Sequence, residues 1–383
     1  MKSNLKSKPK IFISWTLNSG VTYYRFINFI KYMRREYWFG YSKWKPDFQE
    51  VANWEYNIKD KNIANDIGFL MDNCDMVIAS KFHSNGGLKV MHGMKDLHPN
   101  KPFFTELDDN VFAIGKHHQA FESYNPGSEA ELIAKHQIEN STGLIVSTEN
   151  LRTVMEDYNP NIWVIPNAID FEIWDNLKES KRVSKRVRIG WAGGGSHITD
   201  LEMVVPTVKK ILSKFKNVEF CFLGGVIPEL KNLNRVEAYY KWYPIDKYPQ
   251  ALKDLNLDIA IAPLKDSLFN RAKSNLRWLE YSALKIPTVC SDVEPFRCIK
   301  NKEDGFIVSA DNEEMEDTLS DLITNESLRN KIGMNAYERV KKDYNAEIVA
   351  KLYCKTIKHI LQGNQNISDR ARVNFMSSSG VGL

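Results

Sequence analysis

The sequence predicts an α/β protein built from two doubly wound domains that face a cleft. Its 383 residues exceed the roughly 100 to 200 residues of an ordinary single domain. Short apolar runs alternate with longer helical patterns over most of the chain, which is typical of parallel sheets covered by helices. In such sheets ligands bind beyond the carboxyl ends of the strands. We therefore expect functional motifs where predicted strands end.

The first series of apolar runs begins with a buried strand at 11–15. A turn at Asn18, Ser19 and Gly20 follows, and then a helix from about Val21 to Arg35. Each later run is short and apolar and is followed by polar or turn residues. These runs predict strands at 76–80, 102–106, 143–147 and 163–165.

The second series predicts another parallel sheet, followed by amphipathic helices from Glu313 to about Leu361. A basic stretch with almost no apolar periodicity separates the two series and is typical of a linker. The predicted strands lie at 188–192, 218–223, 236–239, 259–263, 288–291 and 305–308. The predicted parts of the chain are an N-terminal domain at 1–174, the linker at 175–187, a second domain at 188–345, a helix at 346–363 and a disordered tail at 364–383.

The composition excludes several classes of protein. With 43% hydrophobic and 26% charged residues, the chain is neither wholly disordered nor mainly embedded in a membrane. It has no apolar run of about 18 residues, as a spanning helix needs, and its N-terminus lacks the apolar centre of a secretory signal. We therefore expect a cytoplasmic protein. Its five cysteines are odd in number and lack metal-ligand spacing, so they suggest neither a disulfide framework nor a zinc site.

Basic and aromatic residues interleave between residues 31 and 45, within a strongly basic N-terminal region. Three readings stay open. The segment suits a membrane surface, where rings sit at the interface and cations meet anionic lipid. It equally suits nucleic acid, where rings stack on bases and cations meet phosphates. Core packing and solvation explain part of the pattern without any partner. The cations concerned are Lys31, Arg34, Arg35, Lys43 and Lys45.

The sharpest local motif is a glycine-rich turn at the end of the strand predicted at 188–192. Gly193, Gly194 and Gly195 are followed by Ser196 and His197, with a helix expected from about residue 199. Glycines let the backbone approach a ligand closely, and free N–H groups at a helix start attract anions such as a diphosphate. The spacing fits neither the Walker nor the dinucleotide fingerprint. A tight turn without a ligand is the alternative.

A second motif follows the strand predicted at 259–263. A helix that begins near Ser274 would place Lys273 at its mouth, where the lysine can hold a diphosphate charge. Glu280 comes two turns later on the same expected face, where a carboxylate suits paired sugar hydroxyls. An ordinary surface pair is the alternative. Arg271 and Asn275 complete the predicted anion-binding set.

These motifs resemble the donor-binding domain of the retaining GT-B glycosyltransferases of glycosyltransferase family 4. The order of the glycine turn, Lys273 and Glu280 is similar to that of the family over roughly the last half of the chain. The 166–170 segment resembles the family's segment before the interdomain linker, and Asp304-Gly305 resembles its usual turn. The resemblance implies two Rossmann-like domains, a nucleotide-sugar donor and no bound metal or other cofactor.

Two departures from the family pattern concern the donor. Many members carry a further glutamate eight positions before the one that Glu280 matches, and here Ala272 stands there. Many also place an arginine and a lysine after the glycine turn, whereas His197 comes here, so Lys273 and Arg271 are expected to supply the charge. The identity of the donor sugar therefore cannot be carried over.

The N-terminal half offers weaker candidates. By resemblance, Gly20, Tyr24 and Arg25 occupy the strand-to-helix turn that faces the acceptor and the donor phosphate, although a plain helix start explains them equally well. Carboxylates cluster after the strand predicted at 102–106 and suit an acceptor hydroxyl, a metal or helix capping. The catalytic candidates are Glu106, Asp108, Asp109, Lys81 and His83, with His117 and His118 as further polar candidates.

The function expected is transfer of a sugar from a nucleotide-diphosphate sugar to a hydroxyl acceptor, with retention of configuration implied by the resemblance. An envelope or surface glycan or lipid is the first acceptor, and a hydroxymethylated DNA base is the second. A non-catalytic protein that binds a nucleotide sugar or a polyanion is the rival class. A phosphorylase-like enzyme is weaker still, because no pyridoxal-phosphate lysine motif is recognised.

Overall fold

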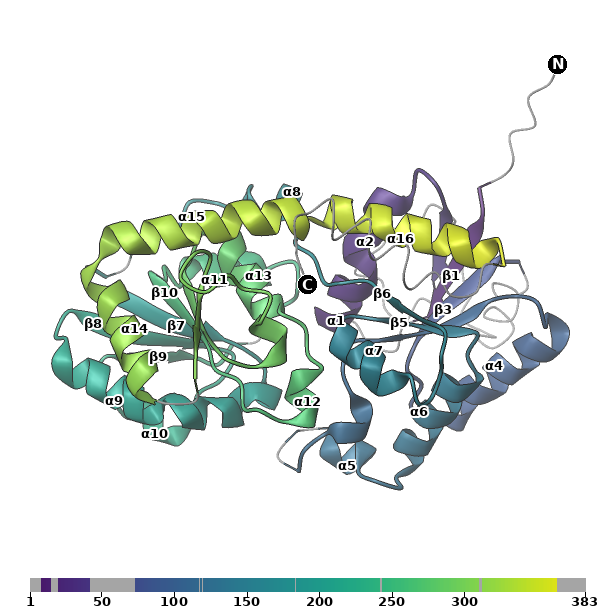
Figure 1. The fold of residues 1–383 in the computed structure, drawn as a ribbon, viewed down its shortest axis with the longest axis horizontal. Coiled ribbons are helices and arrows are strands. Elements are labelled where there is room, and N and C mark those ends of the chain that lie inside the picture. Colours follow the sequence, from purple (N-terminus) through teal and green to yellow (C-terminus); the bar gives the residue numbers. More distant parts are fainter. Residues whose placement is uncertain are drawn as a thin grey trace, which may run out of the picture. The chain divides into compact units, whose positions relative to one another are not determined.

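The protein is described here by a computed structural model that covers residues 8–14, 20–41, 73–116, 118, 120–182, 184–241, 243–309 and 312–363. These residues form two units (Figure 1). Unit 1 contains the described parts of Met1–Phe112, Ser123–Asn167 and Ala346–Leu383. Unit 2 contains those of Ala113–Glu122 and Ala168–Asn345.

Unit 1 is built on a sheet of six parallel strands in the order β2-β1-β3-β4-β5-β6. Its central strands are continuously apolar, as expected for strands covered on both faces, and Phe12, Val77 and Phe104 are fully buried. The strands are β1 (Lys10–Ser14), β2 (Trp38–Tyr41), β3 (Met76–Ser80), β4 (Phe103–Leu107), β5 (Gly143–Val146) and β6 (Ile162–Val164).

The helices of unit 1 begin at residues suited to capping. Ser128 accepts a hydrogen bond from the Glu131 N–H, and Thr148 accepts one from the Leu151 N–H. The helices are α1 (Gly20–Thr22), the π-helical turn η1 (Tyr23–Ile27), α2 (Asn28–Met33), α4 (Asn85–Leu97), α6 (Glu129–Asn140), α7 (Glu149–Met155) and α16 (Ala346–Leu361). Two further short helices, η3 (Val111–Ala113) and α5 (Phe121–Tyr124), each span a point where the chain changes from one unit to the other.

The last helix, α16, belongs to unit 1 and runs alongside α2 (Figure 1). The Tyr37 hydroxyl donates to the Cys354 carbonyl over 2.9 Å, and the rings of Phe29 and Tyr353 meet edge to face. Apolar residues at helical spacing therefore fix the end of the described chain onto its beginning.

Unit 2 contains a second sheet of six parallel strands, in the order β12-β11-β10-β7-β8-β9. Counted within this sheet, the order is that of the dinucleotide-binding folds, in which the first and fourth strands lie side by side. The strands are β7 (Val187–Ala192), β8 (Val218–Leu223), β9 (Val236–Tyr239), β10 (Ile259–Ala262), β11 (Thr288–Ser291) and β12 (Phe306–Val308).

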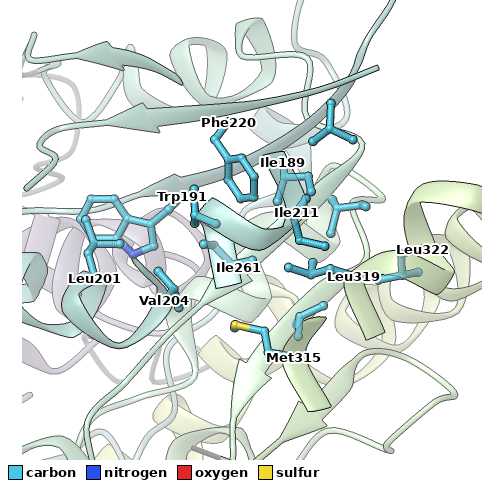
Figure 2. Close-up of a cluster of buried hydrophobic side chains, with 14 of the residues drawn as sticks. Ile189, Trp191, Leu201, Val204, Ile211, Phe220, Ile261, Met315, Leu319 and Leu322 are labelled. Carbon is cyan, nitrogen blue, oxygen red and sulfur yellow. The ribbon is translucent and has the colours of Figure 1, made fainter. Parts of the chain in front are cut away.

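Helices of unit 2 close a hydrophobic core over this sheet (Figure 2). Ile189 and Phe220 from the strands meet Ile211 and Leu319 from two helices, and all four are at most 1% exposed. The helices are α8 (Phe171–Trp174), the 3-10 helix η4 (Gly195–Val204), α9 (Val205–Lys214), α10 (Pro228–Lys231), α11 (Tyr248–Asp254), α12 (Leu268–Arg271), α13 (Leu276–Ala283), η5 (Glu294–Phe296), α14 (Asn312–Thr324) and α15 (Glu326–Asp343).

The described ends of the predicted strands are confirmed to within one residue, and two predicted helix starts are corrected. The predicted end of the first strand at 15 and the turn residues Asn18 and Ser19 lie outside the described residues. The residues after the glycine turn form η4, and the α-helix starts only at Val205. The helix placed near Ser274 starts at Leu276, after Asn275 at its N-cap. The helix expected over 21–35 contains the π-helical turn η1, which adds one residue to the turn around Arg25.

The division of the chain differs from the sequence-based boundaries at two points. The chain leaves unit 1 at Asn167, earlier than the expected boundary at 174, because α8 packs in unit 2, where the rings of Phe171 and Tyr337 meet. Residues of the expected linker also bind within unit 2, since Arg182 forms two hydrogen bonds to Asp258. The helix expected at 346–363 returns to unit 1, and the expected tail lies outside the described residues.

Part of the basic and aromatic segment packs inside unit 1. The segment contains β2, a strand that the sequence reading missed, and Tyr37 and Phe39 are buried there. Packing therefore explains these two rings. Lys31 lies over the Tyr32 ring, Arg35 is exposed, and Lys43 and Lys45 lie outside the described residues. Within the described part of the chain, no helix is both long and apolar enough to span a membrane.

Candidate functional site

The two predicted motifs of unit 2 meet where the strand order of its sheet changes direction. β7 and β10 are neighbours there, and the chain leaves each strand toward a different side. The glycine turn follows β7, and the segment that carries Lys273 follows β10. Crevices of this kind hold ligands in open α/β sheets, because loops from both strands diverge around them.

Two glycines have no room for a side chain: Gly193 in the glycine turn, and Gly224, which follows β8 and packs against that turn. A Cβ added to Gly193 would lie 2.1 Å from the Trp191 ring, so only glycine fits there. Gly224 has a φ of +94°, and its Cβ would lie 2.1 Å from the Gly193 carbonyl oxygen. Gly194 precedes η4 as its N-cap residue, and Gly195 and Ser196 begin it. The glycines therefore allow the turn after β7 to pack closely against Trp191 and against the backbone after β8, and the approach of a ligand to this turn stays a prediction.

His197 is held by a buried carboxylate. Its Nδ1 lies 3.2 Å from Oδ2 of Asp200, which is 3% exposed. The other oxygen of Asp200 accepts hydrogen bonds from the Lys265 backbone N–H at 3.0 Å and from Asn270 Nδ2 at 3.3 Å. The loop after β10 thus fixes Asp200, and Asp200 in turn orients the imidazole.

Lys273 and Arg277 bring positive charge to the same place. The Lys273 ammonium lies 4.4 Å from the centre of the Phe269 ring, and the Arg277 guanidinium lies 5.9 Å from that of Trp191. Burial lowers the pKa of His197, and the charges of Lys273 and Arg277 lower it further against the opposing effect of Asp200. Two cations and a histidine therefore converge beside the glycine turn.

Glu280 is a buried carboxylate on α13 and is only 2% exposed. Its Oε2 accepts hydrogen bonds from the Tyr248 hydroxyl at 3.0 Å and from Arg277 Nη1 at 3.1 Å. Burial, with the Glu280 charge next, raises the pKa of Tyr248 well above its ordinary value. The expectation that Lys273 and Glu280 share a helical face is wrong, because Lys273 lies three residues before α13.

The other residues of the second motif, from Arg271 to Asn275, differ in their exposure and in their partners. Arg271 is exposed and forms two hydrogen bonds to Asp266, at 2.5 and 2.7 Å, so the charge expected from it is already compensated. Asn275 is buried, and its amide donates to Cys298 Sγ at 3.2 Å. Ser274 lies between Lys273 and that N-cap. Ala272 is 1% exposed, so the position of the absent glutamate points into packed interior.

In unit 1 the structure joins two candidates in a buried ion pair. Arg25 and Glu106 have side chains that are each 1% exposed, and Arg25 Nε donates to Glu106 Oε1. The same guanidinium donates to the Ile165 carbonyl at 2.7 Å and to Asn167 Oδ1 at 2.9 Å. Burial raises the pKa of Glu106, and Arg25 opposes that rise. We assign this pair to holding unit 1 together, because neither side chain reaches solvent.

Other candidates form a polar cluster after β3 and β4. The Lys81 ammonium lies 6.0 Å from the Tyr124 ring centre, and Tyr124 forms a 2.6 Å hydrogen bond with His83 Nδ1. Burial acts to lower the pKa of Lys81, but Asp108, Asp109 and Glu106 outweigh it and raise the pKa. Burial lowers the pKa of His83. This cluster keeps carboxylates, a lysine and a histidine together at strand ends.

The last candidates near the N-terminus are less informative. Gly20 begins α1, and Tyr24 is buried in η1, so both are accounted for by the helix start. His117 lies outside the described residues. His118 groups with unit 2, where its ring meets that of Phe269 edge to face. No set of three or more possible metal ligands occurs among the residues that the structure describes.

Three residues of the unit 2 site were not singled out from the sequence: Asp200, Tyr248 and Arg277. Arg277 stands three residues before Glu280, which is the spacing of neighbours on a helix, so it offered a local signal. Asp200 and Tyr248 come to the site from η4 and α11. Asp200 stands three residues after His197, which is also a local spacing, but its contacts with Lys265 and Asn270 and the contact of Tyr248 with Glu280 join distant segments that no local pattern marks.

Comparison with known proteins adds three findings. Residues 208–355 match the family described as glycosyl transferase-like. The chain is 26% identical over 202 residues to the capsular polysaccharide biosynthesis glycosyltransferase CapM of Staphylococcus aureus, a match that covers 48% of this chain and 50% of CapM. It thus spans about half the length of this curated relative.

Solved structures resemble the chain over nearly its whole length. HepE of Anabaena, solved in complex with UDP and glucose, matches with a TM-score of 0.66 at 12% identity, over 91% of this chain and 99% of HepE. The fold is GT-B. A glycosyltransferase from Rickettsia africae matches with a TM-score of 0.64 at 16% identity, over 94% of this chain and all of the other. The GT-B architecture expected from the sequence is confirmed.

Proposed function

We propose that this GT-B protein is a glycosyltransferase that takes a sugar from a nucleotide-diphosphate donor bound to unit 2. The observation that carries the proposal is the convergence of Lys273, Arg277 and His197 beside a glycine turn at the strand switch point. Cations and glycine backbone at such a place suit a diphosphate. The match of 208–355 to a glycosyl transferase-like family supports it, because that segment carries Lys273, Arg277 and Glu280.

The chemistry follows from where charge develops. As the glycosidic bond to the donor breaks, the leaving diphosphate gains negative charge, and preorganised cations stabilise that charge. Lys273 and Arg277 are positioned for this task. Glu280 is 2% exposed and accepts a hydrogen bond from Arg277, so it orients that guanidinium. We propose that its carboxylate also accepts hydrogen bonds from paired hydroxyls of the donor, such as those of a ribose. By resemblance to glycosyltransferase family 4, we propose retention of configuration and no metal requirement.

The acceptor we propose is a hydroxyl of an envelope or surface glycan. CapM, whose name places it in capsular polysaccharide synthesis, supports this choice. The polar cluster of Lys81, His83, Asp108 and Asp109 is the acceptor-side candidate, because it lies at strand ends of unit 1. A cytoplasmic location, with contact to an anionic surface through Lys31, Arg34 and Arg35, belongs to the same proposal.

The test is thermal stability of the purified protein with UDP-glucose, UDP-N-acetylglucosamine, GDP-mannose and ADP-glucose. A ligand that binds only the native state raises the melting temperature by mass action. We expect the melting temperature to rise with nucleotide sugars of one nucleobase only. This rise is expected to be absent in Lys273→Met and in Glu280→Gln. Lys214→Met is the matched control, because Lys214 also lies over a phenylalanine ring of unit 2.

The outcomes separate the rival functions. No rise with any of the four nucleotide sugars contradicts the donor site. A rise without donor hydrolysis or transfer indicates a non-catalytic nucleotide-sugar binding protein. Transfer to hydroxymethylated DNA, and not to glycan or lipid acceptors, overturns the choice of acceptor while leaving the donor site intact.

A further inference from the structure

His197 follows the glycine turn, where the resemblance to glycosyltransferase family 4 predicts a permanently charged arginine or lysine. Histidine differs from arginine and lysine because its charge depends on pH and on its neighbours. Among the residues that the structure describes, the hydrogen-bond partner of the imidazole is Asp200. The imidazole Nδ1 lies 3.2 Å from Asp200, so a hydrogen on Nδ1 is donated to that carboxylate and Nε2 is left as the second functional atom.

The Asp200 carboxylate is too firmly held to move with the histidine. Asp200 is 3% exposed, and the Lys265 backbone N–H and the Asn270 amide bind its other oxygen. Asn270 is itself fixed, since it also donates to the Lys265 carbonyl at 2.9 Å. The imidazole, with its side chain 19% exposed, is therefore presented in one orientation by a rigid support.

The charged groups around His197 come from two elements. Asp200 lies on the same helix, η4, while Lys273 lies in the segment just before α13 and Arg277 in the first turn of α13. Burial and the two cations lower the pKa of His197, and Asp200 opposes them. The imidazole is therefore neutral at neutral pH while no anion is bound. An anion placed between these cations reverses the balance, because it favours a third positive charge.

We propose that His197 takes up a proton when a donor diphosphate binds, so that Nε2–H becomes a third donor to a phosphate oxygen beside Lys273 and Arg277. The inference rests on the proposed function. The proton comes from solvent, and no covalent bond of the donor is altered in this step. The His197–Asp200 pair replaces a permanent cation with one that is charged only in the complex.

Proton uptake makes donor affinity depend on pH. Binding tightens as the pH falls from alkaline values through the range in which the complex, but not the free protein, is protonated. By linkage, one proton taken up corresponds to at most about a tenfold change in affinity per pH unit. A site with only permanent cations shows no such dependence, because lysine and arginine keep their charge throughout this range.

The experiment is isothermal titration of the whole protein with UDP-glucose, GDP-mannose and ADP-glucose at pH 7.5, in buffers of different ionisation enthalpy. These donors carry a doubly esterified diphosphate that does not titrate near neutral pH, so any proton taken up binds to the protein. We expect uptake of a fraction of a proton in the wild type and none in His197→Gln. His136→Gln is the matched control, because His136 is an exposed histidine of unit 1.

A second variant keeps the test decisive if His197→Gln folds poorly. His197→Arg supplies a permanent charge, so we expect it to bind the same donor without proton uptake and with affinity independent of pH. Binding by the wild type without proton uptake overturns the proton inference and leaves the proposed function standing. Uptake that persists in both His197 variants also overturns it. No binding of any of the three donors contradicts the proposed function itself.

Discussion

Each unit places an arginine–glutamate pair near the strand ends of its sheet, and the two pairs differ in exposure. In unit 1, Arg25 and Glu106 are both 1% exposed, and Arg25 has two further acceptors. In unit 2, Glu280 is 2% exposed, but Arg277 is 24% exposed and lies over the Trp191 ring. A sealed pair stabilises its unit, whereas a pair with an accessible guanidinium can also bind a ligand.

Exposure thus distinguishes arginine–glutamate pairs that stabilise a unit from pairs that can bind a ligand. A buried pair that lacks one partner loses stability, because the remaining charge stays desolvated. A partly exposed arginine is replaced at a smaller loss of stability, since water reaches it. The role of such an exposed arginine is therefore measured by ligand affinity, whereas the role of a buried pair is measured by the free energy of unfolding.

The largest expected effect is on the stability of unit 1. Arg25→Met leaves the buried carboxyl of Glu106 without its partner, so we expect a loss of about 3–5 kcal/mol in the free energy of unfolding. Urea denaturation followed by circular dichroism measures it. The double variant Arg25→Met with Glu106→Leu is expected to recover most of the loss. A single variant as stable as the wild type would show that this pair is not sealed.

The next effect concerns the backbone that supports the glycine turn. Gly224→Ala forces a Cβ against the Gly193 carbonyl at a positive φ, so we expect a loss of about 1–3 kcal/mol together with weaker donor binding. Gly93→Ala in α4 is the control. A Cβ there meets nothing within 4 Å, so we expect a gain of about 0.5–1 kcal/mol from helix propensity. Equal stability of the two variants would contradict the close approach.

A third substitution sharpens the contrast between the two arginines. Arg277→Gln removes a charge-assisted donor from the proposed diphosphate site, and we expect donor affinity to fall roughly 10- to 100-fold. Stability is expected to fall less than in Arg25→Met, because Tyr248 still donates to Glu280. Titration calorimetry and urea denaturation measure the two quantities. Unchanged affinity with a large loss of stability would place Arg277 beside Arg25 as a structural residue.

The smallest effect is a pH dependence of stability. The pKa of His197 is lowered in the native protein from 6.5, so the unfolded chain binds this proton more readily. Stability is therefore lost as the pH falls below 6.5 and is unaffected by this group above it. We expect His197→Gln to lose less stability than the wild type between pH 7 and pH 5.5, as measured by urea midpoints. A parallel loss in both proteins would contradict the shift.

Local sequence patterns were enough to predict the strands and the glycine turn. The apolar runs at β8 and β10 are fully buried between helices. Because strands that are buried on both faces consist of continuous apolar residues, they can be predicted from the sequence. Strand β2 was missed because it is only four residues long and lies within a segment rich in basic residues, so no continuous apolar run marks it. The start of α13 was misplaced by two residues: Asn275 is the N-cap residue, and its side chain binds Cys298, a contact with a distant segment that no local pattern predicts.

The sequence by itself determined the fold class, the strand order along the chain and the segments that carry Gly193, Lys273 and Glu280. These follow from periodicity and from the conformations open to glycine, which are local properties. Only the tertiary structure decided that Arg25 closes on Glu106, 81 residues away, and that Tyr248 closes on Glu280. Whether a charge is buried with a partner or left accessible depends on which distant segments pack around it, and that packing separates a structural pair from a binding site.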